Sequence, residues 1–122
     1  MFSDKRTVFS FPTVPMQYLY NITFPSLPSR LDHLLGWLRT YAIPALTAPG
    51  SGAASPLLSM IESPAAEQSQ LDSICLQLAF GSAADVERWE AETLAKVIDR
   101  YQADFAPEPL FFSTLLRILP LA

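Results

Sequence analysis

Charged residues are scarce in this chain of 122 residues and are missing from long stretches of it. Only 16% of the residues are charged, against about 25% in ordinary soluble domains, whereas 50% are hydrophobic. Thr7–Ser29 and Thr40–Ile61 carry no charge, and residues 110–121 carry only Arg117. The chain therefore has more apolar surface than a small core needs. We expect it to bind a protein partner or to form a homo-oligomer.

Cysteine and histidine are almost absent, with one of each, Cys75 and His33. A single cysteine allows no disulfide within the chain, which favours a reducing compartment. Zinc sites need several nitrogen and sulfur ligands, so we expect no metal site. A Cys75–His33 pair would resemble a nucleophile with its base. However, Cys75 lies in an apolar stripe, where cysteine is usually buried and inert. We expect no catalytic residue, no cofactor and no metal.

Basic stripes and long apolar runs are also missing. Residues 1–61 hold four basic and two acidic groups (+2), and residues 62–122 hold four basic and ten acidic groups (−6). Nucleic acid is excluded as a partner because phosphate binding needs a basic surface. No apolar run reaches the roughly 20 residues that span a bilayer, and the N-terminus lacks a signal-peptide pattern. These features predict a cytoplasmic protein without a membrane span.

Residues 1–28 have the pattern of an extended arm or a β-hairpin. Arg6–Phe11 is rich in β-branched and aromatic residues, and Gln17–Phe24 alternates between polar and apolar residues. Such alternation is typical of a half-buried strand. Pro12–Pro15 would form the turn between the two strands. Because proline cannot donate a backbone hydrogen bond, we expect these to be edge strands.

Residues 29–46 predict the first helix, since leucines recur there at helical spacing. The helix should end near Pro44, because a residue before proline avoids helical geometry. Residues 47–55 are rich in glycine, serine and alanine, a composition typical of a flexible linker.

Residues 56–122 predict the main helical part of the domain. Its clearest helix begins at Ser82, an N-cap residue followed three positions later by Asp85. Apolar residues then recur at spacings of three and four, with acidic residues largely off that face. The other predicted elements are a helical turn over 56–62 and helices over 63–81 and 110–119.

Together these patterns predict a single α+β domain over residues 1–122 that is mainly α. An N-terminal β-hairpin or extended arm would precede a bundle of three to five short helices. The residues expected in its core are Leu34, Leu38, Leu71, Ile74, Leu78, Trp89, Val97, Ile98 and Tyr101.

The leading functional hypothesis is a non-enzymatic protein-binding domain that acts as an adaptor, chaperone, inhibitor or other regulator, or as an obligate subunit. An apolar helix face with an acidic surround would meet the partner. Large aromatic residues are enriched at such interfaces. The residues predicted to bind the partner are Trp37, Tyr41, Phe111, Phe112, Leu115 and Ile118.

A small-ligand-binding or enzymatic domain is the alternative hypothesis. It would place an aromatic pocket near Trp37 and Tyr41, which lie four residues apart on one face of the first predicted helix. The sequence shows no pair of carboxylates at a spacing that fixes general acid and base roles. This favours the non-enzymatic hypothesis over the alternative.

Overall fold

The structure of this protein is a computed structural model that describes residues 16–62, 71–107 and 110–121. The described strands and helices are β2 (Tyr18–Ser26), α1 (Leu31–Trp37), α2 (Ile43–Leu46), β3 (Ala54–Met60), β4 (Asp72–Phe80), α3 (Ala83–Trp89), α4 (Ala95–Asp104) and β5 (Phe112–Arg117). A 3-10 turn at Pro28–Arg30 precedes α1, and π turns at Leu38–Ala42 and Glu90–Leu94 join α1 to α2 and α3 to α4.

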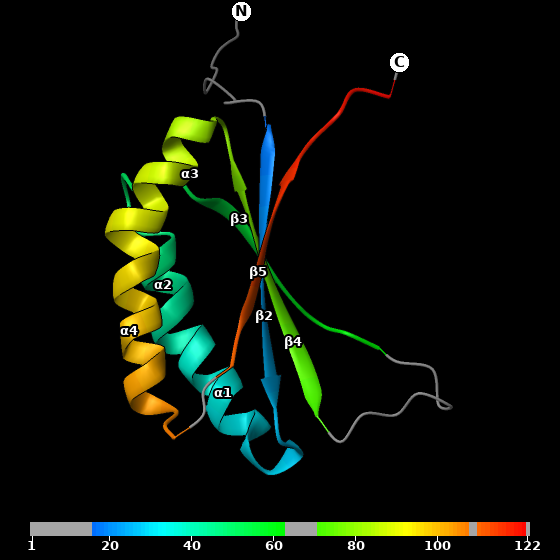
Figure 1. Ribbon diagram of the computed structural model, residues 1–122, viewed down its shortest axis with the longest axis vertical. Helices are drawn as coiled ribbons and strands as arrows, with labels where there is room; N and C mark the ends of the chain where they lie inside the picture. The colour runs from blue at the N-terminus through cyan, green and yellow to red at the C-terminus, as the bar shows by residue number, and fades with distance from the viewer. Residues whose placement is uncertain (1–15, 63–70, 108–109, 122) are drawn as a thin grey trace, which may run out of the picture.

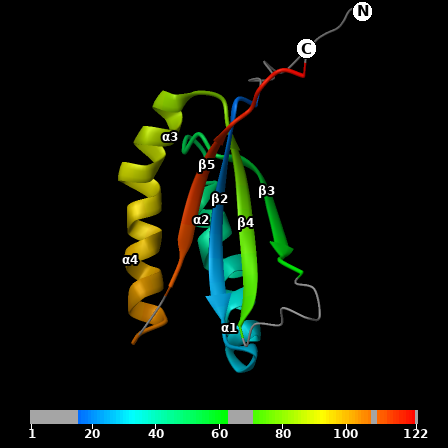
Figure 2. The same ribbon diagram turned by 45° about the vertical axis from the view of Figure 1, so that its right-hand side comes forward.

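The described strands form one antiparallel sheet in the order β3-β4-β2-β5. Both helical segments cover the same face of this sheet, and no described helix lies on the other face (Figures 1 and 2). The order βαββαβ with this strand arrangement is the ferredoxin-like fold. The prediction of a mainly α bundle of three to five helices is therefore wrong.

The alternation predicted for residues 17–24 is confirmed in β2. Tyr20, Ile22 and Phe24 are buried towards the helices, whereas the residues between them face the other side. β2 is nevertheless a central strand, paired with β4 on one side and β5 on the other, so its prediction as an edge strand is wrong. The strand and turn predicted over residues 6–15 lie outside the described residues.

Three segments predicted to be helical are strands. Residues 56–62 contribute to β3, the second half of the segment 63–81 is β4, and the segment 110–119 contains β5. In β4 the side chains of Ile74 and Leu78 fit a helical spacing and a strand alternation equally well. Hydrogen bonding to β2 makes this segment a strand rather than a helix. The sequence of the segment by itself does not show that it pairs with β2.

The two remaining helix predictions are confirmed. The backbone N–H of Asp85 donates to the Ser82 side chain at 3.1 Å, which is the predicted N-cap. The first helical segment does not end at Pro44 but continues to Leu46. α2 begins at Ile43, directly after the π turn, so Pro44 lies in its first turn, where a missing N–H is tolerated.

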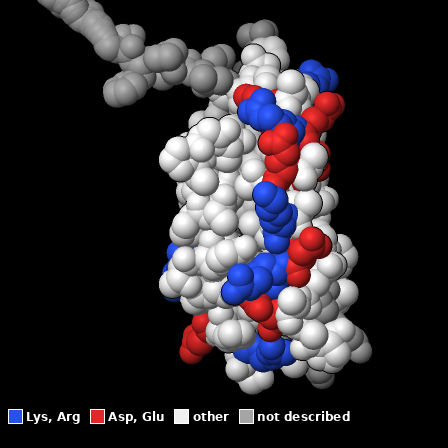
Figure 3. All heavy atoms as spheres, turned by 90° about the vertical axis from the view of Figure 1, so that its left-hand side faces the viewer, with Lys and Arg blue, Asp and Glu red and all other residues white. Residues whose placement is uncertain are grey.

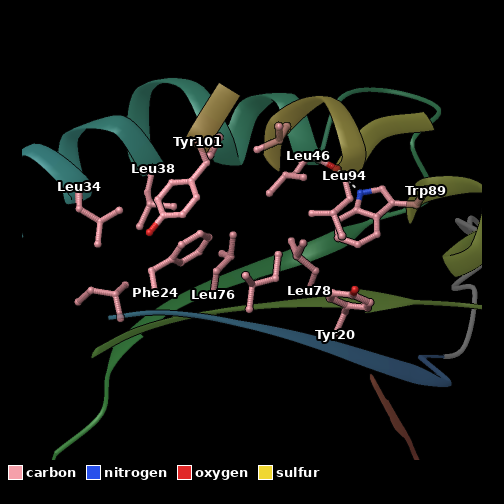
Figure 4. Packing of buried hydrophobic residues seen from close by; sticks show 14 of the residues in the cluster. Tyr20, Phe24, Leu34, Leu38, Leu46, Leu76, Leu78, Trp89, Leu94 and Tyr101 are labelled. Carbon is pink, nitrogen blue, oxygen red and sulfur yellow. Dashed lines mark hydrogen bonds between the residues drawn. The ribbon is translucent and has the colours of Figure 1, made fainter. Parts of the chain in front are cut away.

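The core lies between the sheet and the helices (Figure 4). The indole N–H of Trp89 donates to the carbonyl of Leu46 at 3.0 Å and thereby joins α3 to the end of α2. Leu76 and Leu78 of β4 are fully buried and point from the middle of the sheet towards the helices. All of the predicted core residues are buried except Leu71, which is exposed, and Ile98, which is half-buried.

The first prediction tests this one-sided core with two identical substitutions. Leu76 is fully buried, whereas Leu119 is 62% exposed. We expect Leu76→Ala to lower the free energy of unfolding by about 2–5 kcal/mol, because it leaves a cavity in the core. Leu119→Ala should change it by less than about 0.5 kcal/mol. Urea denaturation measures both, and equal effects would contradict the placement of the core.

Candidate functional site

A cavity of about 350 Å³ lies where the sheet and the helix layer separate, at the end of β2. The end of β2 and the 3-10 turn form one wall, and the end of α4 with the segment leading to β5 forms the other. Its lining residues are Pro25, Ser26, Leu27, Arg30, Leu34, Leu71, Tyr101, Phe105, Pro107 and Leu110. Ligand sites are concave, mostly apolar and of this size.

Local backbone geometry builds the first wall. Pro28 opens the 3-10 turn, and the N–H of Arg30 donates to the carbonyl of Leu27 at 2.9 Å. The turn carries the chain from the sheet to the helix layer within a few residues. The Ser26 hydroxyl donates to the carbonyl of Leu27 at 3.0 Å, so this hydroxyl group already has an acceptor within the wall.

Two aromatic rings at the end of α4, one in the helix and one directly after it, form the second wall. Tyr101 and Phe105 lie one turn apart, with ring centroids 5.0 Å apart. The Tyr101 hydroxyl donates to the carbonyl of Leu110 at 2.8 Å, which fastens the segment before β5 to the helix. The ring of Phe24 meets Tyr101 edge-on at 5.1 Å and joins this wall to the core.

Trp37 supports these rings from behind. Its ring centroid lies 5.6 Å from Tyr101 and 5.4 Å from Phe105. The indole N–H donates to the carboxylate of Asp104 at 3.0 Å, which also accepts from Arg100 at 3.1 Å. The cavity walls are thus held by side chains that do not line the cavity.

Among the described residues that line the cavity, Arg30 is the only charged one. It is half-buried, and its guanidinium lies 5.7 Å from the centroid of the Phe105 ring. Burial raises the pKa of Tyr101, and the nearby charge of Arg30 lowers that pKa in part. Within the described residues, Arg30 forms no salt bridge.

Two other hollows lack this combination of rings and a half-buried charge. A groove of about 470 Å³ runs along β3, and its one charged residue, Arg39, is exposed. A smaller hollow of about 260 Å³ lies between Tyr41 and Lys96 on the outer side of the helices. In the described part of the chain, no three His, Cys, Asp or Glu side chains are grouped to hold a metal ion.

A second buried tyrosine lies at the other end of the helix layer. The Tyr20 hydroxyl donates to the Glu90 carboxylate at 2.8 Å, and the Tyr20 ring packs on Trp89 at 4.9 Å. Burial raises the pKa of Tyr20; a hydrogen bond with Ser113 opposes this rise and the Glu90 carboxylate reinforces it. This contact ties β2 to the second helical segment.

The uncovered face of the sheet is a further surface feature, and we call it the open face. Its paired positions are Leu19, Asn21, Thr23, Pro25, Ala54, Leu57, Ser59, Ser73, Cys75, Gln77, Ala79, Phe112, Thr114 and Leu116. None of them is charged. Leu57 and Phe112 are 58% and 60% exposed there. On the helix side, by contrast, charged side chains gather along α3 and α4 (Figure 3).

The residues predicted to bind a partner do not form one surface. Trp37 and Tyr41 lie together at 5.4 Å, and Phe111 is half-buried against Tyr101. Phe112 lies on the open face, whereas Leu115 on the same strand faces the helix side.

The last of them, Ile118, follows β5 and donates its N–H to the carbonyl of Gln17. Cys75 and His33 also lie apart. Cys75 is a half-buried residue of the open face, and His33 is on α1 beside Phe105.

The cavity residues Arg30 and Phe105 were not predicted as site residues, and Tyr101 was predicted only as core. One signal for Arg30 is present in the sequence. It is a cation at the start of a helix, where the helix dipole favours anions. Nothing in the sequence brings Leu110 to Arg30, because they are distant in the chain and meet only across the cavity.

No protein-family model and no curated protein matches this chain. Among solved structures, it is similar to a monooxygenase of Streptomyces coelicolor in complex with nanaomycin D, with 12% identity, coverage of 86% of this chain and 93% of that chain, and a TM-score of 0.58. A hydroxynitrile lyase of Passiflora edulis matches with 12% identity, coverage of 87% and 100%, and a TM-score of 0.51.

An ethyl tert-butyl ether d family protein of Bacillus halodurans matches with 11% identity, coverage of 84% and 99%, and a TM-score of 0.56. The chain has the ferredoxin-like α+β fold of these proteins. At such low identity the likeness shows the fold alone. None of the described helices is long and apolar enough to cross a membrane.

The leading hypothesis of a helical adaptor, chaperone or regulator is wrong. The apolar segment from Leu110 onward, which should have supplied a helix face, forms strand β5 instead. The concave aromatic cavity fits the small-ligand-binding alternative better than the adaptor hypothesis. That alternative expected an aromatic pocket near Trp37 and Tyr41. Neither residue lines this cavity: Trp37 packs against its rings Tyr101 and Phe105, and Tyr41 lines the separate hollow beside Lys96.

The second prediction concerns alkaline pH. A tyrosine whose pKa is raised by folding stabilises the fold below its ordinary pKa of about 10, and this contribution is lost as pH rises through the folded pKa. Burial raises the pKa of Tyr20 and Tyr101. We therefore expect the free energy of unfolding to fall above about pH 10. Tyr20→Phe and Tyr101→Phe should each flatten that fall in urea denaturation; an unchanged slope in both would contradict the assignment.

Proposed function

We propose that this protein binds a small, mainly apolar organic molecule in the cavity between the end of β2 and the end of α4. The observation that carries the proposal is the pair of aromatic rings, Tyr101 and Phe105, that line a concave space of about 350 Å³. The two side chains are only 2% and 8% exposed, so a planar apolar ligand would contact the ring atoms that face the cavity. Offset or edge-to-face contacts of this kind add to the free energy of burial.

The rigidity of the wall supports this proposal. Trp37 packs behind both rings, and its indole is fixed by Asp104, so the wall is organised before a ligand arrives. Preorganised sites lose less conformational entropy on binding. The neighbour from Streptomyces coelicolor, named as a complex with nanaomycin D, provides an example of a similar fold with a small molecule bound.

The third prediction tests the cavity with the neutral fluorescent probe N-phenyl-1-naphthylamine. We expect the wild-type protein to bind one probe per chain. Leu27 is an exposed residue of the cavity wall, so Leu27→Trp should fill the cavity without entering the core. Probe affinity should then fall at least tenfold, which is about 1.4 kcal/mol.

Leu119→Trp is the matched control, because Leu119 is exposed and does not line the cavity. It should leave probe affinity unchanged. Equal affinity in both variants would place the probe elsewhere and contradict the proposed site. Circular dichroism of both variants checks that each remains folded.

We also propose that two copies of the chain associate through the open face. In a monomer the exposed face of an antiparallel sheet is usually polar, whereas this face exposes Leu57, Phe112 and Leu116. Interface centres are depleted of charge. Because this face carries no charge, two copies of it meet without electrostatic repulsion and cover each other's exposed apolar side chains. A two-fold interface pairs the same patch on both subunits.

The fourth prediction uses adjacent leucines on β5. Leu116 faces the open side and is 41% exposed, and Leu115 faces the helix side and is 47% exposed. We expect the wild-type protein to sediment as a dimer at micromolar concentration and Leu116→Asp to weaken the dimer at least tenfold. Leu115→Asp should not weaken it. A monomeric wild-type protein, or equal effects of both substitutions, would contradict the proposal.

Of the residues first expected to bind a partner, Phe112 belongs to this proposed interface, and Trp37 supports the ligand cavity. A cytoplasmic location also stays part of the proposal, because a lone cysteine on the open face suits a reducing compartment.

A further inference from the structure

We infer that the ligand of this cavity carries a carboxylate, which the guanidinium of Arg30 binds at the cavity wall. The inference rests on the proposed function and names the chemical class of the ligand: an apolar, ring-sized organic acid.

Arg30 differs from the arginines of α3 and α4 in having no acidic partner. Arg88 pairs with Asp85 at 2.9 Å, and Arg100 pairs with Asp104 at 3.1 Å. In the described part of the chain, Arg30 forms neither an ion pair nor a side-chain hydrogen bond, although it is half-buried. A half-buried guanidinium has lost part of its hydration, and an anion in contact with it restores that stabilisation.

The position of Arg30 is defined by the wall. Its backbone N–H is bonded to Leu27, and its guanidinium lies over the Phe105 ring at 5.7 Å. Stacking on an aromatic ring holds the guanidinium while leaving its edge N–H groups free. The charge is also near enough to Tyr101 to lower the pKa of that phenol. The cation therefore lies beside the two rings that would pack on the ligand.

The other polar groups of the cavity are already engaged. Ser26 donates to the carbonyl of Leu27, and Tyr101 donates to the carbonyl of Leu110. No acidic side chain is among the lining residues that the structure describes. Among the described lining residues, the guanidinium of Arg30 is thus the polar group whose N–H groups still lack a hydrogen-bond acceptor. A carboxylate supplies two acceptor oxygens in the spacing of a guanidinium edge, and a cationic ligand would be repelled.

The experiment compares two ligands of the same shape, 1-naphthoate and the neutral 1-naphthamide, by isothermal titration calorimetry at low ionic strength. The wild-type protein should bind the acid at least tenfold more tightly than the amide. Arg30→Gln should weaken binding of the acid to the level of the amide and leave binding of the amide unchanged. The retained binding of the amide shows that this variant is folded.

Arg39→Gln is the matched control. Arg39 also has no ion pair in the described residues, but it lies in the separate groove along β3. The variant should keep the full preference for the acid. A loss of preference in Arg39→Gln, or a preference that survives Arg30→Gln, would overturn the assignment to Arg30.

The outcomes separate the inference from the proposed function. If the neutral naphthylamine probe binds in the cavity but the wild-type protein does not prefer the acid, only the inference fails. If the probe and both naphthalene ligands fail to bind, the proposed function and the inference both fail.

Discussion

The contacts of Tyr101 connect most of the features on which the cavity depends. The ring packs on Phe24 of the sheet and on Trp37 of the first helical segment, and the hydroxyl holds the carbonyl of Leu110. Because a buried hydroxyl without a partner is costly, this bond also fixes where the chain leaves α4 and approaches β5. The same side chain thus closes the core and forms a wall of the cavity.

The one-sided covering of the sheet accounts for the scarcity of charge in the sequence. Each strand needs apolar residues at the positions below the helices, and in addition the open face carries only uncharged residues. The charged side chains are concentrated on the outer side of the helices, where α3 and α4 meet solvent. The apolar excess that suggested a binding helix face is explained by the two faces of the strands and by the lining of the cavity.

Local signals in the sequence were sufficient for β2 and for the helical segment that begins after Ser82. β2 shows a long alternation of polar and apolar residues. The helical segment begins with a specific N-cap residue, as the hydrogen bond from the Asp85 N–H to the Ser82 side chain shows. β4 was mistaken for a helix because Ile74, Cys75 and Leu78 fit helical spacing while its small or uncharged residues on the open face hide the alternation. Its identity as a strand depends on pairing with β2, about fifty residues away in the chain.

The cavity was still harder to predict, because its parts come from three distant segments. Sequence periodicity assigned Tyr101 to the core, which is correct, but a residue on the core stripe of a helix can also line a cavity at the end of that helix. Arg30 is a cation at the start of a helix, and its meaning depends on its having no ion pair among the described residues in three dimensions. A cation that lies against an aromatic ring and forms no ion pair in the described part of the chain therefore says more about the proposed ligand than any motif in the sequence.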